Sequence, residues 1–525
     1  MVNSVFFQCF TVSLISTPKC NLPALLLLSF IFQMSFKKEK KPLLTREIRD
    51  DYMGSSTASL SSYDYETYVK PYAHTETGTY WYRWYILALF SLVASMCNIA
   101  WNSWGPIETT SRAVFGWSKG TISLLSDWGA ITFVLAVFPS SYILDVFGLR
   151  RATLMAILCL VIGTGLRCIT SHPETATYLI HVGQIMIGLS GPVGQASATA
   201  LSSTWFPPNQ RTTATAIASL ASYCGTAISF VIGPHLVGDI DKTHMSKTNP
   251  GYKEEIHKLS DEIMRFMYIQ FGVCSGLFLL VLISFPSKPP KPPSATAVME
   301  RVDFMAGLKK LFFNPQFQLI AFAYGLTTGI YSAWCSDLAL NLKAFHIDDE
   351  TAGWFGFWAV IAGSVSGITL SLMADRLGAL KLLIVLLFFV ATAAFSVFSL
   401  VCVKIIPNSM ALFYLTSVVG GLCLNGSIPL FFELAVESSY PVAEGINTGA
   451  MTFSNNLYCL IFLSIPLIPG SGTAWMNWCL VGSCVLCIPT MILFKERYRR
   501  LEVDMTDEED SAPTNVAAMG SPISF

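Results

Sequence analysis

The residues of this sequence whose chemistry stands out most are ionisable groups inside long apolar stretches. They are Asp127, His181, Asp337, Glu433 and Glu437. A charged side chain surrounded by hydrocarbon is disfavoured by about 2.5–3.5 kcal/mol, so each of these groups calls for an ionic partner or for a use. Carboxyl and imidazole groups whose pKa is shifted by burial can take up and release protons. The sequence therefore offers candidates for moving protons through an apolar barrier.

Asp337 is the preferred proton carrier among these groups. Burial would raise the pKa of its carboxyl group from about 3.9 toward the range of an acidic compartment. An aspartate that only accepts hydrogen bonds at the rim of a helix is an equally good interpretation. His181 and Asp127 are the next candidates for proton coupling.

The composition is that of a protein embedded in a membrane. Of the 525 residues, 53% are hydrophobic and 13% are charged, whereas soluble proteins carry about 25% charged residues. The net charge of -1 leaves no basic excess, so nucleic acid is not an expected partner. The sequence contains no metal-ligand cluster, nucleophile motif or glycine-rich phosphate loop, so we expect neither an enzyme nor a bound cofactor.

Apolar segments of about 20 residues, long enough to cross a bilayer as a helix, recur along the chain. Twelve are predicted, at 82–105, 121–143, 152–169, 176–200, 212–234, 265–285, 316–340, 352–373, 381–403, 410–434, 446–468 and 474–494. The expected organisation is an N-terminal tail (1–80), a six-helix half (81–285), a linker (286–315), a second six-helix half (316–494) and a C-terminal tail (495–525). Residues 1–33 are treated as an optional extension.

The distribution of lysine and arginine predicts the orientation. Twenty-one of them fall on the side of the tails and the linker and nine on the other side, and cytoplasmic loops carry the excess. Both tails are therefore expected in the cytoplasm. There, Glu39 followed by Leu43 and Leu44 matches an acidic dileucine sorting pattern, which predicts a clathrin adaptor as partner and lysosomal residence.

Two stretches of the chain repeat. The sequences DVFGLRR at 145–151 and DRLGALK at 375–381 both place a glycine three residues after an aspartate and end in basic residues, with an offset of 230 residues. A second pair of landmarks around Pro207 and Pro441 has nearly the same offset, 234 residues. The repeat predicts an all-α bundle of twelve transmembrane helices in two pseudo-symmetric six-helix halves.

The two turns resemble motif A of the major facilitator superfamily, the second more closely, because Val146 and Leu149 stand in the first where basic residues are expected. Further stretches resemble solute carrier family 49 over about residues 80–500: WNSWGPI at 101–107, GTGLRC at 163–168, STWF at 203–206 and FELAVESSYP at 432–441. The resemblance implies a transporter of the lysosomal membrane that works by alternating access, with proton-driven movement of pyridoxine as the leading activity. Choline and haem are the solutes of relatives.

Aromatic residues near the ends of the first and seventh spans are candidates for binding a ring-shaped solute. They are Trp101 with the adjacent Asn102, and Tyr331 with Trp334. Two aromatic faces, one from each half, could hold a planar ring between them. The alternative is an aromatic belt at the membrane interface. For Trp101, the resemblance implies contact with substrate.

Amide side chains inside spans could hydrogen-bond a hydroxylated ring. They are Gln195, Asn425, Asn455 and Asn456. The resemblance aligns Asn456 with a substrate-contacting glutamine of the relatives, and Gly191 with another polar position. Hydrogen bonds between helices, worth about 0.6 kcal/mol on average, are an equally good interpretation of these amides.

Charged residues at the cytoplasmic ends are expected to form a gate. The gating candidates are Asp145, Arg150, Asp375, Arg376, Glu433 and Glu437. Glu433 and Glu437, one helical turn apart, are expected to pair with Arg376 or Arg150. Arg167, near the opposite end, is expected to pair with Asp127 or to reach toward the interface.

The expected function is transport of a small organic solute, with protons and the lipid bilayer as further partners and a monomer as the expected state. A non-transporting membrane sensor or scaffold is the alternative from another class, suggested by a tyrosine-rich N-terminal tail with Tyr52, Tyr63, Tyr65 and Tyr68.

Overall fold

A computed structural model describes residues 77–238, 252–297, 301–336, 349–407, 409–465 and 474–511, together with Leu338, Leu342 and Phe345. These residues belong to one compact unit, His74–Phe525. The predicted dileucine signal (Glu39, Leu43 and Leu44) and the predicted proton carrier Asp337 lie outside the described residues.

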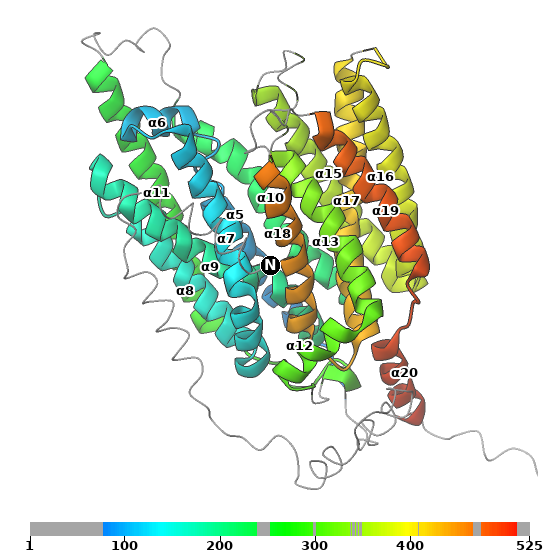
Figure 1. The fold of residues 1–525 in the computed structure, drawn as a ribbon. Coiled ribbons are helices and arrows are strands. Elements are labelled where there is room, and N and C mark those ends of the chain that lie inside the picture. The colour runs from blue at the N-terminus through cyan, green and yellow to red at the C-terminus, as the bar shows by residue number, and fades with distance from the viewer. Residues whose placement is uncertain are drawn as a thin grey trace, which may run out of the picture. The chain divides into compact units, whose positions relative to one another are not determined.

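The described chain is built of helices, and each of the twelve predicted spans coincides with one long helix (Figure 1). In the first half these are α5 (Tyr82–Trp101), α7 (Lys119–Phe147), α8 (Leu149–Leu166), α9 (Pro173–Trp205), α10 (Arg211–Leu236) and α11 (Tyr252–Ser284). In the second half they are α13 (Pro315–Ser336), α15 (Asp349–Leu377), α16 (Leu380–Cys402), α17 (Met410–Ser439), α18 (Glu444–Ser464) and α19 (Ala474–Leu493). The all-α expectation is confirmed.

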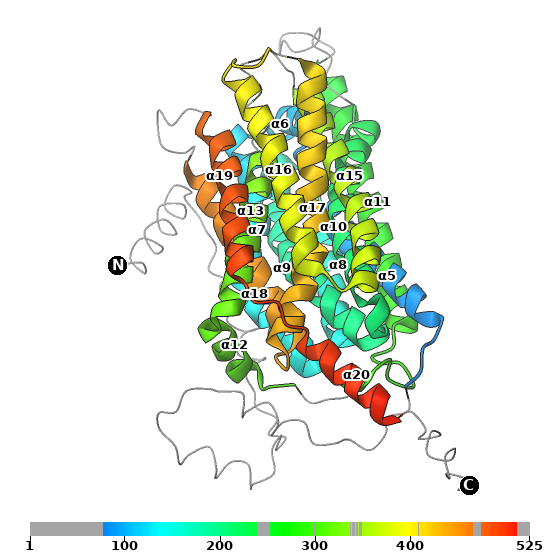
Figure 2. The same ribbon diagram turned by 90° about the vertical axis from the view of Figure 1, so that its right-hand side faces the viewer.

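Shorter helices distinguish the two ends of the bundle. Helix α6 (Glu108–Phe115) lies at one end, which we call the α6 face. Helices α12 (Phe304–Phe313) and α20 (Arg499–Ser511) lie at the opposite end, as Figures 1 and 2 both show. The short turns η1 (Pro208–Gln210) and η3 (Ala295–Ala297) belong to that end too, which we call the linker face.

Each half has its own hydrophobic core. One cluster of buried side chains is drawn from residues 86–285, with Phe90, Ile157 and Phe285 among its members. Another is drawn from residues 311–494, with Phe317 and Phe388 among its members. Each core is thus drawn from one half, although Tyr223 of the first half packs against the core of the second.

Nine of the described helices are long and apolar enough to cross a membrane, judged by length and composition. The three other long helices, α9, α13 and α18, carry more small and polar residues along their lengths. They pack on other helices of the bundle, α13 on α18 and α18 on α9. Polar residues are tolerated there because they face protein rather than lipid.

Both repeated turns contain a glycine with a positive φ angle directly after the preceding helix. Gly148 follows α7 with φ 83°, and Gly378 follows α15 with φ 62°. Residues with a Cβ rarely adopt this left-handed region, so glycine allows the next helix to begin at once. Both turns have the same spacing between aspartate and glycine. Each aspartate therefore lies at the same place relative to the start of the following helix.

We predict that Gly225→Ala destabilises the first half. A Cβ at Gly225 on α10 would lie 2.3 Å from the carbonyl oxygen of Ser95 on α5, and overpacking of this kind costs about 1–3 kcal/mol. The measurement is thermal unfolding in detergent, with Gly276→Ala as control, because a Cβ at Gly276 on α11 meets nothing within 4 Å. Equal melting temperatures for the two variants would contradict the close packing of α5 on α10.

Candidate functional site

Trp101 ends α5 and lies flat against α7. Its side chain is half-buried, and its Nε1 donates a hydrogen bond of 3.0 Å to the carbonyl oxygen of Ser126. A Cβ at Gly129 would lie 2.0 Å from the indole Cε2 atom. Glycine at position 129 is therefore required for this ring position, and the side chain remains partly exposed.

A buried polar network supports the backbone next to Trp101. Gln184 Nε2 donates to the carbonyl oxygen of Trp101 at 2.8 Å, and Arg167 Nη1 donates to that of Ala100 at 3.0 Å. Arg167 also donates to Gln184 and lies over the Trp104 ring at 5.7 Å. These donors satisfy carbonyls that the end of α5 leaves without helical partners. Arg167, which is 1% exposed, therefore neither reaches toward solvent nor uses Asp127 in this network.

Asn102 lies beside the neighbouring helix α10. Its Nδ2 donates to the carbonyl oxygen of Asn98 at 3.0 Å and contacts Thr226 Oγ1 at 3.5 Å. Thr226 in turn contacts Asn98 Oδ1 at 3.5 Å. The long contacts between α5 and α10 leave this amide able to exchange partners.

Two of the predicted proton-coupling residues lie within the described part of the chain. His181 on α9 is partly buried, and its Nδ1 accepts a hydrogen bond of 3.0 Å from Trp128 Nε1 on α7. Such an imidazole is neutral with its proton on Nε2, because a protonated ring has no acceptor. Asp127 is the residue before Trp128 and is exposed. Protonation of His181 would therefore break a contact between α7 and α9.

In the second half, the two predicted aromatic residues pack inside their own core. Trp334 is 2% exposed and donates from Nε1 to Asn477 Oδ1 on α19 at 2.8 Å. Tyr331 stacks on Trp334 at 6.2 Å between ring centroids, and both lie near Phe395. The expected sandwich with Trp101 across the halves is not formed by these rings.

The side chains of Tyr331 on α13 and Asn425 on α17 are polar neighbours in this region, and Tyr331 also lies near Cys335. The Tyr331 hydroxyl and Asn425 Nδ2 are both buried, and neither makes a hydrogen bond of standard geometry within the described part of the chain. A Cβ at Gly421 would lie 2.8 Å from the Tyr331 hydroxyl, and Gly421 is one turn before Asn425 on α17. Buried donors are nearly always satisfied, so these two neighbouring groups, one on each helix, are candidates for ligand contact.

The remaining predicted amides differ in their surroundings. Asn455 Nδ2 on α18 donates to Thr328 Oγ1 on α13 at 2.7 Å, a link between helices of the same half. Asn456 Nδ2 donates to the carbonyl oxygen of Thr452, one turn earlier, at 2.9 Å. Gln195 is partly buried on α9.

At the linker face, Asp375 joins the second half to the first. Its carboxylate accepts from the backbone amides of Thr212 at 3.0 Å and Thr213 at 2.8 Å, and from Thr213 Oγ1 at 2.6 Å. These amides lie in the first turn of α10, where backbone donors lack partners and the helix dipole favours a negative charge. The aspartate of the second repeated turn therefore caps a helix of the opposite half.

Asp145 belongs to the first repeated turn and makes the equivalent contact from the first half to the second. It lies at the start of α18, as Asp375 lies at the start of α10. A Cβ at Gly445, in the first turn of α18, would lie 2.6 Å from Asp145 Oδ1. Beside it, Arg301 of the linker donates to Glu444 Oε1 at 2.6 Å and lies over the Tyr440 ring at 5.1 Å. Burial lowers the pKa of Arg301, but the Glu444 carboxylate more than offsets this and raises it above its usual value.

The expected partner of Glu433 and Glu437 was wrong. Both carboxylates pair with Arg500 of α20, each at 2.7 Å. Arg376 is exposed, and Arg150 donates to the carbonyl oxygen of Leu282 at 2.9 Å. Glu433 also accepts from Thr215 of α10, so this cluster touches both halves. Burial lowers the pKa of the Arg500 guanidinium, but Glu437 and Glu433 reverse the effect and raise it.

Asp504, one turn further along α20, reaches the first half. It pairs with Arg211 at 2.8 Å, and its Oδ1 accepts from the backbone amide of Thr296 at 2.9 Å. Arg211 also donates to Ser294 and Thr296. Arg211 and Asp504 are 2% and 4% exposed, so this ion pair is protected from water.

From the sequence, Arg211, Arg301 and Arg500 contribute only to the count of basic residues that predicts the orientation in the membrane, and Asp504 has no predicted role. One signal was present: Arg500, Val503 and Asp504 recur at the spacing of one helix face. All three are buried in the structure. The pattern would have predicted a helix after the last span that docks by this face.

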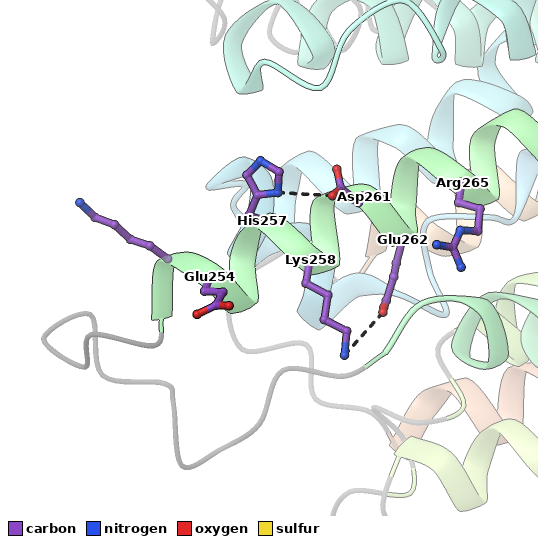
Figure 3. A pocket seen from close by; sticks show the side chains of 7 residues that line it. Glu254, His257, Lys258, Asp261, Glu262 and Arg265 are labelled. Carbon is purple, nitrogen blue, oxygen red and sulfur yellow. Dashed lines mark ion pairs between the residues drawn. The ribbon is translucent and has the colours of Figure 1, made fainter.

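A shallow surface hollow lies apart from these residues, on the exposed N-terminal turns of α11 at the α6 face (Figure 3). Its charges are paired along the helix, His257 with Asp261 at 3.3 Å and Lys258 with Glu262 at 3.9 Å. Such i,i+4 pairs are typical of a solvated helix face.

Sequence comparison places the chain in a family. The profile of the Major Facilitator Superfamily matches residues 83–463. The solute carrier family 49 member 4 homolog of Xenopus tropicalis is 38% identical over 428 residues, covering 81% of this chain and 93% of the relative. The chain belongs to solute carrier family 49 of the Major Facilitator Superfamily. The expected family is confirmed, and this chain is a membrane transporter.

More distant relatives of this solute carrier share its length. The choline/ethanolamine transporter flvcr2b of Danio rerio is 26% identical and covers 89% of this chain and 95% of its own. The crystal structure of the Escherichia coli fucose:proton symporter FucP has a TM-score of 0.63 at 11% identity, covering 78% of this chain and 98% of its own. This likeness shows the fold.

We predict that the Arg211–Asp504 pair of this solute carrier is strongly coupled. Removing one partner of a buried ion pair costs about 3–5 kcal/mol, so Arg211→Gln and Asp504→Asn should each lower the unfolding temperature markedly. The double variant should lose less than the sum, with a coupling of about 0.5–3 kcal/mol.

The matched control is the exposed pair Arg112–Glu108, whose side chains are 38% and 39% exposed. Arg112→Gln should cost about 1 kcal/mol or less. Additive effects of the Arg211 and Asp504 changes would show that α20 does not dock as the structure has it.

Proposed function

We propose that this solute carrier moves a small organic solute by alternating access, with the linker face as the closed gate. The observation that carries the proposal is that two separately packed halves meet at this face through polar contacts. Asp375 crosses to α10, Arg301 to Glu444, and Asp504 to Arg211. Ion pairs and helix caps of this kind can separate when water enters and solvates the charged groups.

The proposed solute is a planar, hydroxylated ring of the pyridoxine type. Trp101 offers a partly exposed aromatic side chain in the first half. The neighbouring Tyr331 hydroxyl and Asn425 Nδ2 offer polar atoms in the second that make no hydrogen bond of standard geometry within the described residues. Stacking on an indole and hydrogen bonds to ring substituents are the interactions that such a solute needs.

A cationic solute is the second candidate, because relatives at 26–28% identity are named as choline/ethanolamine transporters. An aromatic face at Trp101 suits a quaternary ammonium as well as a ring. A haem-type solute, as implied by the resemblance, and a non-transporting sensor or scaffold are further alternatives. A panel of labelled solutes separates these possibilities, since a scaffold moves none.

Proton coupling is proposed through the ionisable groups of the apolar stretches. Asp337 is the first candidate, followed by His181 and Asp127. The Trp128–His181 hydrogen bond supports a role for His181, because protonation turns its accepting nitrogen into a donor and breaks the bond. A lumenal acidification would then loosen α7 from α9.

The proposed location is the lysosomal membrane, with both tails in the cytoplasm. We predict that the double variant Leu43→Ala, Leu44→Ala shifts the protein to the plasma membrane, because adaptor proteins read the paired leucines after Glu39. Microscopy against a lysosomal marker is the measurement, with Leu60→Ala as the control change elsewhere in the tail. Unaltered lysosomal staining would rule out this signal.

The test of transport is uptake of labelled pyridoxine, choline and ethanolamine into proteoliposomes with an imposed pH gradient. We predict that Trp101→Ala weakens solute affinity about 5- to 150-fold, corresponding to about 1–3 kcal/mol of lost stacking and burial. Gly129→Ala should have a similar effect, because its methyl group would occupy the position of the Trp101 ring.

Gly272→Ala is the control, since a Cβ there meets nothing within 4 Å. Expression and melting temperature are measured for all three variants, so that misfolding is recognised. Normal uptake by both Trp101→Ala and Gly129→Ala would move the solute site elsewhere. Absence of uptake of every solute by the unmodified protein would favour the sensor or scaffold.

A further inference from the structure

Helix α12 is two-sided, and its outer side is apolar. Gly307 and Leu311 are buried, and a Cβ at Gly307 would lie 3.1 Å from Ile446 Cδ1 of α18. On the outside, Met305 is 67% exposed, and Phe312 and Phe313 are each 71% exposed. Large apolar side chains exposed together on one short helix indicate an interaction surface.

The position of α12 indicates what this surface meets. The helix ends at Phe313, and α13 begins at Pro315 and runs the length of the second half. Figures 1 and 2 both show α12 at the linker face, beside the ends of the long helices. Phe312 and Phe313 therefore lie within three residues of the start of α13, at one end of the bundle of long helices. Aromatic side chains at this depth are typical of the membrane interface.

Lys309 and Lys310 of α12 are also exposed, one turn before the two phenylalanines. An interfacial helix that combines basic and aromatic residues binds through buried apolar area and attraction to anionic lipids. We propose that α12 is an interfacial helix that inserts Met305, Phe312 and Phe313 into the leaflet at the linker face and binds anionic lipid headgroups through Lys309 and Lys310. This surface goes beyond the proposed transport function.

The same helix is directly connected to a gate contact. Asp303 caps α12 by accepting from the backbone amide of Met305 at 3.2 Å. Arg301, two residues earlier, holds Glu444 at 2.6 Å. Lipid binding that fixes α12 also restricts the chain that carries Arg301. Anionic lipid should therefore stabilise the closed linker face.

The experiment is hydrogen exchange of the intact protein in nanodiscs that hold one copy each. Amides of residues 304–313 are compared between discs of phosphatidylcholine alone and discs with added phosphatidylserine. We expect slower exchange in the anionic discs, reduced by high salt because ionic attraction is screened. Lys309→Glu with Lys310→Glu should remove this difference and weaken phosphatidylserine binding, titrated by native mass spectrometry, at least about 30-fold, at about 1 kcal/mol per lysine.

The matched control is Lys253→Glu with Lys258→Glu, an equal charge change on exposed α11 residues at the α6 face (Figure 3). It should leave the α12 difference unchanged. Phe312→Ser with Phe313→Ser should speed exchange in both lipids, because loss of the apolar anchor does not depend on lipid charge.

Three outcomes would overturn the proposal. Equal exchange of α12 in both lipids and in detergent would show that no lipid is bound there. Protection that appears only in discs with two copies would assign the surface to self-association, and protection only on addition of a soluble protein would assign it to that partner. None of these results depends on solute uptake, so failure of the lipid proposal and failure of the transport proposal are distinguishable.

Discussion

The linker face depends on one constraint: charges removed from water must remain paired. Arg500 is 1% exposed between Glu433 and Glu437, and breaking such a cluster without water would cost about 3–5 kcal/mol. The same groups are well solvated once water reaches them. The first half contributes Thr215 to this cluster, whereas the charged groups themselves come from α17 and α20. In the proposed transport cycle, separation of the halves would remove the Thr215 hydrogen bond and admit water to charges that otherwise depend on one another.

The contacts across this face follow the internal symmetry, with the charges reversed. The chain that leaves the first half supplies Arg301 to Glu444 at the start of α18. The chain that leaves the second half supplies Asp504 to Arg211 at the start of α10. Each half thus ends in a segment that reaches the corresponding helix of the other. Because the signs are reversed, neither segment can form its ion pair within its own half. Arg301 would meet Arg211 there, and Asp504 would meet Glu444.

The sequence predicted the parts that depend on local pattern. All twelve spans follow from apolar length, and the repeated turns follow from the spacing of Asp145 and Asp375 to their glycines. Arg500 was missed because its partners are 63 and 67 residues away, and a charged tail after a span resembles an orientation signal. Trp334 was a candidate because it lies in the part of the seventh span that corresponds to Trp101 in the first, and correspondence along the chain does not reveal which side of α13 meets the other half.

The two halves contribute differently to the space between them, despite their common fold. Trp101 stays partly exposed where Gly129 lets its ring lie against α7, and Gln184 holds its backbone. Its counterparts in the second half are covered by their own core, where the Tyr331 hydroxyl and Asn425 Nδ2 are among the buried polar atoms of the described residues that lack a hydrogen bond of standard geometry. An aromatic side chain from one half and polar atoms from the other would be complementary to a solute with one apolar face and one polar edge. The proposed solute site thus depends on residues that differ between the halves, whereas the contacts at the linker face follow the repeat.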